Sequence, residues 1–161
     1  MNNINTIIIV VIVAVVILWP IIKKITKNIK IENSDSIHIA CLYGDLTKIK
    51  RLLASGANIN SKDFSNKTPL MYAAEDGAID TIDFLIKSGA NINDTDVRGD
   101  SALIIAVKNN NIKASELLIE SGADLNIKNE DNKDAFEIAK DLGHKEIIDF
   151  IGKKRSDTIK Q

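Results

Sequence analysis

The sequence predicts an all-α fold: a solenoid of stacked helix-turn-helix units, preceded by one N-terminal helix that spans a membrane. Three observations predict it. A five-residue motif recurs every 33 residues, residue types that begin and end helices recur with the same step, and residues 7–22 form an uncharged run made almost entirely of Ile and Val. A fixed period of this length is typical of repeat proteins, whose units stack side by side.

The uncharged run and its flanks predict a transmembrane anchor over residues 6–22, after a short tail at 1–5. Sixteen helical residues rise about 24 Å, slightly less than the roughly 30 Å hydrocarbon layer. The stems of Lys23 and Lys24 can make up the difference, and Trp19 suits the membrane interface. A buried core helix would have a polar face, which this run lacks. A cleaved signal peptide stays the alternative, although no basic side chain precedes the run and no small-x-small cleavage site follows it.

The charges around the run predict its orientation. Four lysines follow it, and no basic side chain precedes it: Lys23, Lys24, Lys27 and Lys30. Because cytoplasmic flanks are enriched in Lys and Arg, we expect a single-pass protein with a basic linker at 23–33 and its folded domain in the cytoplasm. The single cysteine, Cys41, agrees, since it cannot form an internal disulfide.

The repeating motif is GANIN at 56–60 and 89–93, and GADLN at 122–126. Four residues suited to cap a helix N-terminus have the same spacing: Asp35, Thr68, Ser101 and Asp134. Each of them is followed, where its helix is predicted to end, by one residue that tolerates the left-handed conformation: Gly44, Gly77, Asn110 and Gly143. A second helix is predicted in each unit, at 46–53, 79–86, 112–119 and 146–151. No unit can bury its apolar face alone, so the units must stack.

The segment TPLMYAA at 68–74, with Gly77 and the residues from 85 to 93, resembles the ankyrin repeat. The resemblance covers residues 34–152, with units at 34–63, 64–96, 97–129 and 130–152, and leaves a basic C-terminal tail at 153–161. It implies helix pairs joined by finger-like turns. Two features depart from the family: its first-helix histidine is kept only as His38, and its finger-tip glycine is kept as Gly99 but replaced by Asn66 and Asn132.

Charge argues against a nucleic-acid partner. Residues 32–151 hold 21 acidic and 13 basic side chains, so phosphates would be repelled. The same excess favours a partner with a basic surface. The basic cluster around Lys153 and Arg155 either forms a solvated tail or contacts anionic lipid.

No pattern for catalysis, a cofactor or a metal is present in the sequence. His38 and His144 lie three repeats apart, and Cys41 has no histidine and acid placed to activate it. Asp94 and Asp96 begin like a calcium loop, but Arg98 takes the third ligand position and Ile105 the final one. We therefore expect a protein that is not an enzyme.

The resemblance implies a monomeric module that binds another protein through the concave face made by the fingers and the first helix of each unit. Phe64, Tyr43 and Val97 stand out, because a finger-tip aromatic has no core to enter. The two alternatives are an immunity or antitoxin-like inhibitor and an accessory factor that tethers an enzyme at the membrane. The candidate partner-binding residues are Tyr43, Phe64, Ser65, Lys67, Glu75, Asp76, Val97, Arg98, Asp100, Lys108 and Asn109.

Overall fold

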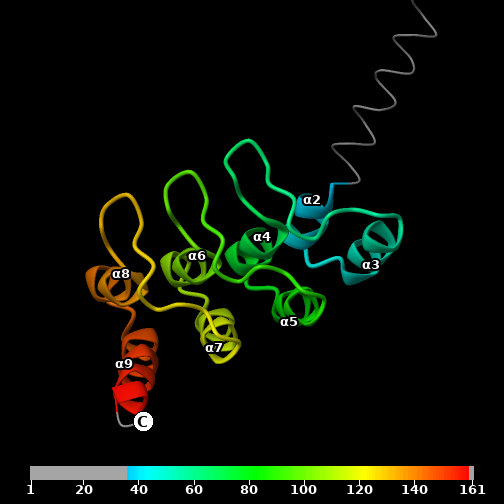
Figure 1. Ribbon diagram of the computed structural model, residues 1–161. Coiled ribbons are helices and arrows are strands. Elements are labelled where there is room, and N and C mark those ends of the chain that lie inside the picture. Colours follow the sequence, from blue (N-terminus) through cyan, green and yellow to red (C-terminus); the bar gives the residue numbers. More distant parts are fainter. Residues whose placement is uncertain (1–35, 160–161) are drawn as a thin grey trace, which may run out of the picture. The chain divides into compact units, whose positions relative to one another are not determined.

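The computed structural model describes residues 36–159, which form eight helices in four pairs (Figure 1). Helices α2, α4, α6 and α8, here called the inner helices, lie in one row, and α3, α5, α7 and α9, the outer helices, lie in a second row (Figure 1). No β-strand forms among these residues, where one isolated bridge joins Thr95 and Ser101. The predicted helix-pair architecture is confirmed. The pairs are α2 (Ile37–Leu42) with α3 (Leu46–Ala54), α4 (Pro69–Asp76) with α5 (Ile79–Lys87), α6 (Ala102–Lys108) with α7 (Ile112–Glu120), and α8 (Ala135–Leu142) with α9 (Lys145–Ile159).

The inner helices begin where the 33-residue spacing predicts. The side chains of Thr68, Ser101 and Asp134 each accept a hydrogen bond from the backbone N–H three residues on, at 3.4, 3.3 and 2.9 Å. At Asp134 the capping box is complete, because the Glu137 carboxylate accepts the Asp134 N–H in return. Each bond satisfies an amide that the helix itself leaves unpaired. The fourth predicted cap, Asp35, lies outside the described residues.

The inner helices also end as predicted. Gly77 and Gly143 have φ values of +76° and +74°, and Asn110 has +54°. This left-handed conformation turns the chain back toward the outer helix within a few residues. The turn places each inner helix against its own outer helix.

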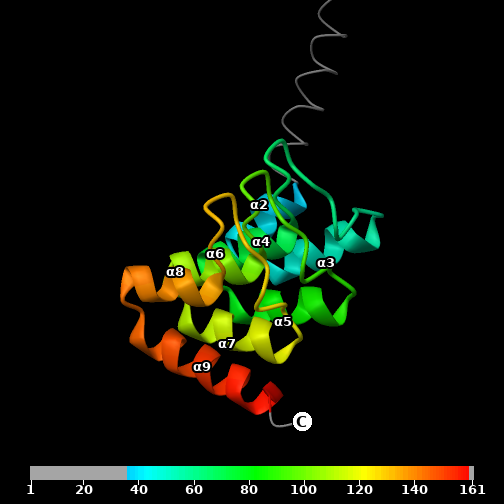
Figure 2. The ribbon, with the colours of Figure 1, turned by 60° about the vertical axis from the view of Figure 1, so that its left-hand side comes forward.

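The core runs as a stripe along the stack. Ala40, Ala73, Ala106 and Ala139 are buried at equivalent positions of the inner helices, and their small side chains let these helices approach closely. Each inner helix contacts the next, and α7 contacts both α5 and α9. Figure 2 shows the two rows from a second direction. Because each inner helix packs against the inner helix of the next unit, each unit depends on its neighbours for burial.

The C-terminal end differs from the sequence-based expectation. A tail was expected at 153–161, yet α9 continues through Ile159. Arg155 holds this extension against the rest of the fold. Its guanidinium donates to the carboxylate of Asp134 at 2.8 Å and to the Leu125 carbonyl at 3.1 Å, and lies 4.9 Å from the ring centroid of Phe136. The segment expected as a tail is therefore helical through Ile159, while Lys153, Ser156 and Asp157 remain exposed.

The predicted anchor at 6–22 and the linker at 23–33 lie outside the described residues. Within residues 36–159, no helix is long and apolar enough to cross a membrane.

Candidate functional site

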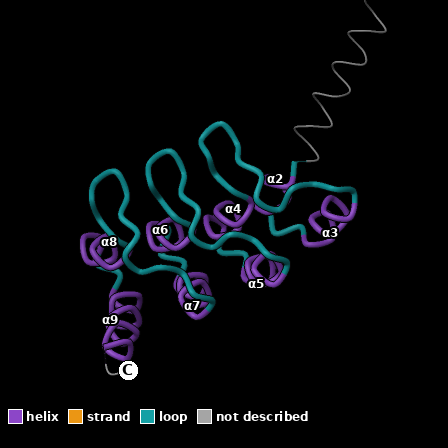
Figure 3. The backbone as a smooth tube through the Cα atoms, viewed as in Figure 1, coloured by secondary structure: helices purple, strands orange, loops and turns teal. Residues whose placement is uncertain are grey.

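Three long turns rise from the inner helices, and their backbones follow one pattern (Figure 3). We call them the first finger (63–67), the second finger (96–100) and the third finger (129–133). The residue that opens each finger, Asp63, Asp96 or Asn129, accepts two backbone N–H groups with one side-chain oxygen, from two and four residues later, at 2.8 to 3.2 Å. Asn66, Gly99 and Asn132 take the left-handed conformation at the fourth position. Asparagine tolerates that conformation, so replacing the family's glycine preserves the turn.

The fingers are joined to one another by backbone hydrogen bonds. Val97 N–H donates to the Ser65 carbonyl at 2.9 Å, and Glu130 N–H donates to the Arg98 carbonyl at 2.8 Å. A second set lies below the fingers, where the side-chain oxygens of Asn60 and Asn93 accept the Asn91 and Asp124 amides of the next unit. The three fingers therefore form one continuous ladder.

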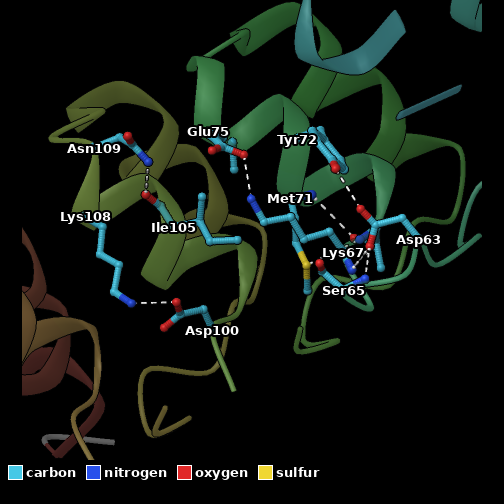
Figure 4. A network of polar contacts seen from close by, with 12 residues as sticks. Asp63, Ser65, Lys67, Met71, Tyr72, Glu75, Asp100, Ile105, Lys108 and Asn109 are labelled. Atoms are coloured by element: carbon cyan, nitrogen blue, oxygen red, sulfur yellow. Dashed lines mark hydrogen bonds and ion pairs between the residues drawn. The ribbon is translucent and has the colours of Figure 1, made fainter. Parts of the chain in front are cut away.

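An ion pair connects the base of each finger to the inner helix that follows it, and its polarity alternates along the stack. Lys67 pairs with Glu75 at 2.8 Å, Asp100 pairs with Lys108, and Lys133 pairs with Asp141 at 2.7 Å. Figure 4 shows the first two. In each case the partners lie eight residues apart. We call these three pairs the finger ion pairs.

The first finger carries an additional polar network (Figure 4). The Tyr72 hydroxyl donates to the Asp63 carboxylate at 2.7 Å, and His38 Nε2 lies 2.9 Å from the Ser61 carbonyl. Burial, aided by this hydrogen bond to Asp63, raises the pKa of Tyr72 to about 12. Burial alone would raise the pKa of Asp63, but the bonds from Tyr72 and from the Lys67 and Ser65 amides lower it. The network stabilises the first finger, because the raised pKa keeps Tyr72 protonated as a hydrogen-bond donor and the lowered pKa keeps Asp63 ionised as its acceptor.

The fingertips are exposed, in contrast to their bases. The side chain of Phe64 is 108% exposed and that of Val97 is 60% exposed. Ser65 and Arg98 are exposed beside them, and the Arg98 guanidinium forms no ion pair with a described residue. The expectation that a finger-tip aromatic has no core to enter is confirmed for Phe64.

The remaining predicted residues divide into two groups. Tyr43, Asp76 and Asn109 occupy one equivalent position at the end of α2, α4 and α6, and all three are exposed. The side chains of Lys67, Glu75 and Lys108 are engaged in the finger ion pairs. Asp100 is only 1% exposed, and its carboxylate also accepts the Asn129 side chain at 3.2 Å. Asp100 is therefore part of the frame of the finger, and a direct contact of Asp100 with a partner stays a prediction.

An open groove of about 420 Å³ lies at the C-terminal end of this face, between α6, α8 and the third finger. Its floor contains Leu142, whose side chain is 51% exposed. Sequence reasoning did not select this groove or Leu142. The available signal was positional, because Leu142 is the fourth member of the series that begins with Tyr43, Asp76 and Asn109. The groove is lined by Lys108, Asn129, Asp131, Lys133, Ile138, Asp141 and Leu142.

Groups that carry out chemistry are not gathered anywhere in the described part of the chain. Cys41 is buried, and burial raises the pKa of its thiol to about 12, which keeps it protonated and unreactive. Residues 36–159 contain no cluster of three or more His, Cys, Asp or Glu side chains that could hold a metal ion. The features that the structure assembles are a rigid frame of fingers, an exposed row of tips and a groove.

Comparison with known families gives three matches to the family model of ankyrin repeats, over residues 17–96, 37–129 and 94–161. No curated protein matches the chain.

Proposed function

Because the chain belongs to the ankyrin-repeat family, whose repeats are generally non-catalytic modules for binding other proteins, we propose that it is a membrane-held, non-catalytic module that captures a partner protein with its fingertips and inner helices. The observation that carries the proposal is the pairing of rigid backbone with exposed side chains. Phe64, Val97 and Arg98 project from two adjacent fingers, which hydrogen bonds and the finger ion pairs hold in place.

This arrangement suits recognition for an energetic reason. Binding costs conformational entropy when loops become ordered, and a preorganised loop has already lost that entropy during folding. Aromatic and arginine side chains are also enriched among the residues that dominate binding energy. The folded protein leaves Phe64 fully exposed, so the cost of that exposure is offset only when a partner covers it.

The experiment is site-specific crosslinking in cells, with a photoreactive phenylalanine analogue replacing Phe64. The matched control places the analogue at Lys113, an exposed residue of α7 on the outer row. We expect a covalent adduct with a defined protein from position 64 and none from position 113. Adducts from position 113 alone would place the binding surface on the outer helices and overturn the proposal.

Affinity for the protein identified in this way gives the quantitative test. Truncation of a binding hot spot costs 2 kcal/mol or more, which is a loss of about thirtyfold. We expect this loss, or a larger one, from combined Phe64→Ala and Arg98→Ala substitution, and almost none from Lys113→Glu.

The membrane part of the proposal rests on the sequence of residues 6–30. The uncharged run and the four lysines after it favour a cytoplasmic position for the ankyrin domain. A reporter that is active only outside the cytoplasm, fused after Gln161, should be silent. Its activity, or release of the chain from membranes by alkaline extraction, would contradict the anchor or its orientation.

A further inference from the structure

The groove between α6, α8 and the third finger has two apolar lining residues, both on α8. Ile138 and Leu142 lie one helical turn apart on α8, so their side chains fall on the same face. Ile138 is almost buried, while Leu142 exposes half of its side chain. In the two preceding units the position of Leu142 is held by Asp76 and Asn109, both polar. The exposed aliphatic side chain is therefore a feature of the last unit rather than of the repeat.

The charges around the groove are unequally compensated. Its two lysines are both engaged, Lys108 by Asp100 and Lys133 by Asp141. Asp131 also lines the groove, is exposed, and forms no ion pair with a described residue. Together with Asp100, which pairs with Lys108, three carboxylates (Asp100, Asp131 and Asp141) face two lysines, so the net charge around the groove is −1. An acidic segment would thus be repelled, and a basic one attracted.

We propose that this groove binds a segment of the partner protein in which one aliphatic side chain lies beside Lys or Arg residues. The aliphatic side chain covers Leu142, and a basic residue pairs with the carboxylate of Asp131. This inference rests on the proposed protein-binding function and specifies the partner's chemistry at one end of the surface. It separates the groove from the tips of Phe64 and Val97, which lie on the first two fingers.

A selection from a peptide library tests the chemistry without assuming a sequence. The library consists of displayed twelve-residue peptides with Leu, Ile or Val at one central position and random Lys, Arg, Asp, Glu, Ser and Asn around it. The bait is the full chain in detergent micelles, and peptides that also bind the Leu142→Glu, Asp131→Lys chain are removed. We expect enrichment of Lys and Arg next to the central residue. Enrichment of acidic residues, or no enrichment, would overturn the proposal.

The affinity of one enriched peptide, measured by fluorescence anisotropy, then locates the site. Leu142→Ser and Asp131→Asn should each weaken binding at least tenfold. Asp149→Asn, which removes an exposed carboxylate from α9, should leave it unchanged and is the matched control for charge. Equal affinity of all three variants would place the peptide elsewhere and overturn the assignment.

Failure here can be told apart from failure of the proposed function. If position 64 still crosslinks a protein while no basic peptide is enriched, the fingertip surface stands and the groove assignment falls. If the groove binds its peptide but position 64 gives no adduct, the groove stands and the fingertip proposal falls.

Discussion

The base and the tip of each finger share one turn but have different surroundings. At the bases, Lys67, Asp100 and Lys133 are each engaged by an oppositely charged residue of the following helix. At the tips, Phe64, Val97 and Arg98 contact solvent and have no such partners. The comparison separates two tasks within a few residues: the bases hold the backbone in register, and the tips are available to a ligand. Changes at the bases should therefore alter stability, and changes at the tips should alter binding.

The largest effect is expected at the base of the second finger. Asp100→Ala removes the charged hydrogen bond from Lys108 and leaves the Asn129 side chain without its acceptor. Lys108 is one-third exposed and can be hydrated again, so we expect a loss of about 2 kcal/mol of unfolding free energy rather than the full cost of a buried charge. Urea unfolding followed by circular dichroism measures it. Asp131→Ala, at a tip, is the control, and equal losses would erase the distinction between base and tip.

The next effect sharpens the comparison by testing a turn that lies outside the fingers. Gly89 has φ +91°, and a β-carbon there would meet no neighbour within 4 Å. Gly89→Val should still cost about 1–2 kcal/mol, since a β-branched residue is strained in that conformation. Gly152 lies inside α9, with open space around it, so Gly152→Val should be nearly neutral. Similar melting temperatures for the two variants would contradict the backbone explanation.

A smaller effect concerns the acid range. Burial alone would raise the pKa of Asp134, but bonds from the Glu137 amide and from Arg155 lower it from its usual 3.8. The stabilisation of the fold by the ionised Asp134 carboxylate is therefore complete above pH 3.8 and is lost as pH falls through the lowered pKa of this group. Asp134→Asn keeps a capping side chain but loses the ion pair. Its unfolding free energy should fall less steeply in this range than that of the parent chain. Parallel curves for Asp134→Asn would show that the pair with Arg155 contributes nothing.

The smallest stability effect is expected at the tip itself. Phe64→Ala removes a side chain that touches no core, so the unfolding free energy should change by less than about 0.5 kcal/mol. The same variant should lose binding to the crosslinked partner. A loss of several kcal/mol in unfolding would mean that Phe64 packs against something in solution and is not a free contact residue.

The sequence predicted what depends on neighbours along the chain. The caps at Thr68, Ser101 and Asp134 and the left-handed residues Gly77 and Gly143 follow from contacts within a few positions, and a 33-residue spacing repeats them. It could not separate Asp100 from Arg98, since both are charged residues of one finger. Only the fold shows that Asp100 turns inward toward Lys108 and Asn129. Opposite charges eight residues apart in three successive units were a signal from which the finger ion pairs could have been predicted.

The extent of α9 was missed for a related reason. The residues after 152 contain a basic cluster, which by composition alone suits a solvated tail. The structure continues the helix because Arg155 reaches Asp134 and Leu125, residues 21 and 30 positions earlier. A contact of that separation leaves no local pattern in the sequence.

The alternating polarity of the finger ion pairs has a consequence for how this protein can gain or lose repeats. Copying one 33-residue unit, or deleting the middle one, would bring together two fingers whose base residues carry the same charge, where the present order of these residues is Lys67, Asp100 and Lys133. At a helix spacing of about 10 Å such repulsion is weak, about 0.4 kcal/mol in water, but it recurs at the helix side of each pair. Gain or loss of two units together would preserve the order. The unit of duplication best tolerated by this protein is thus a pair of repeats, although the sequence period is a single one.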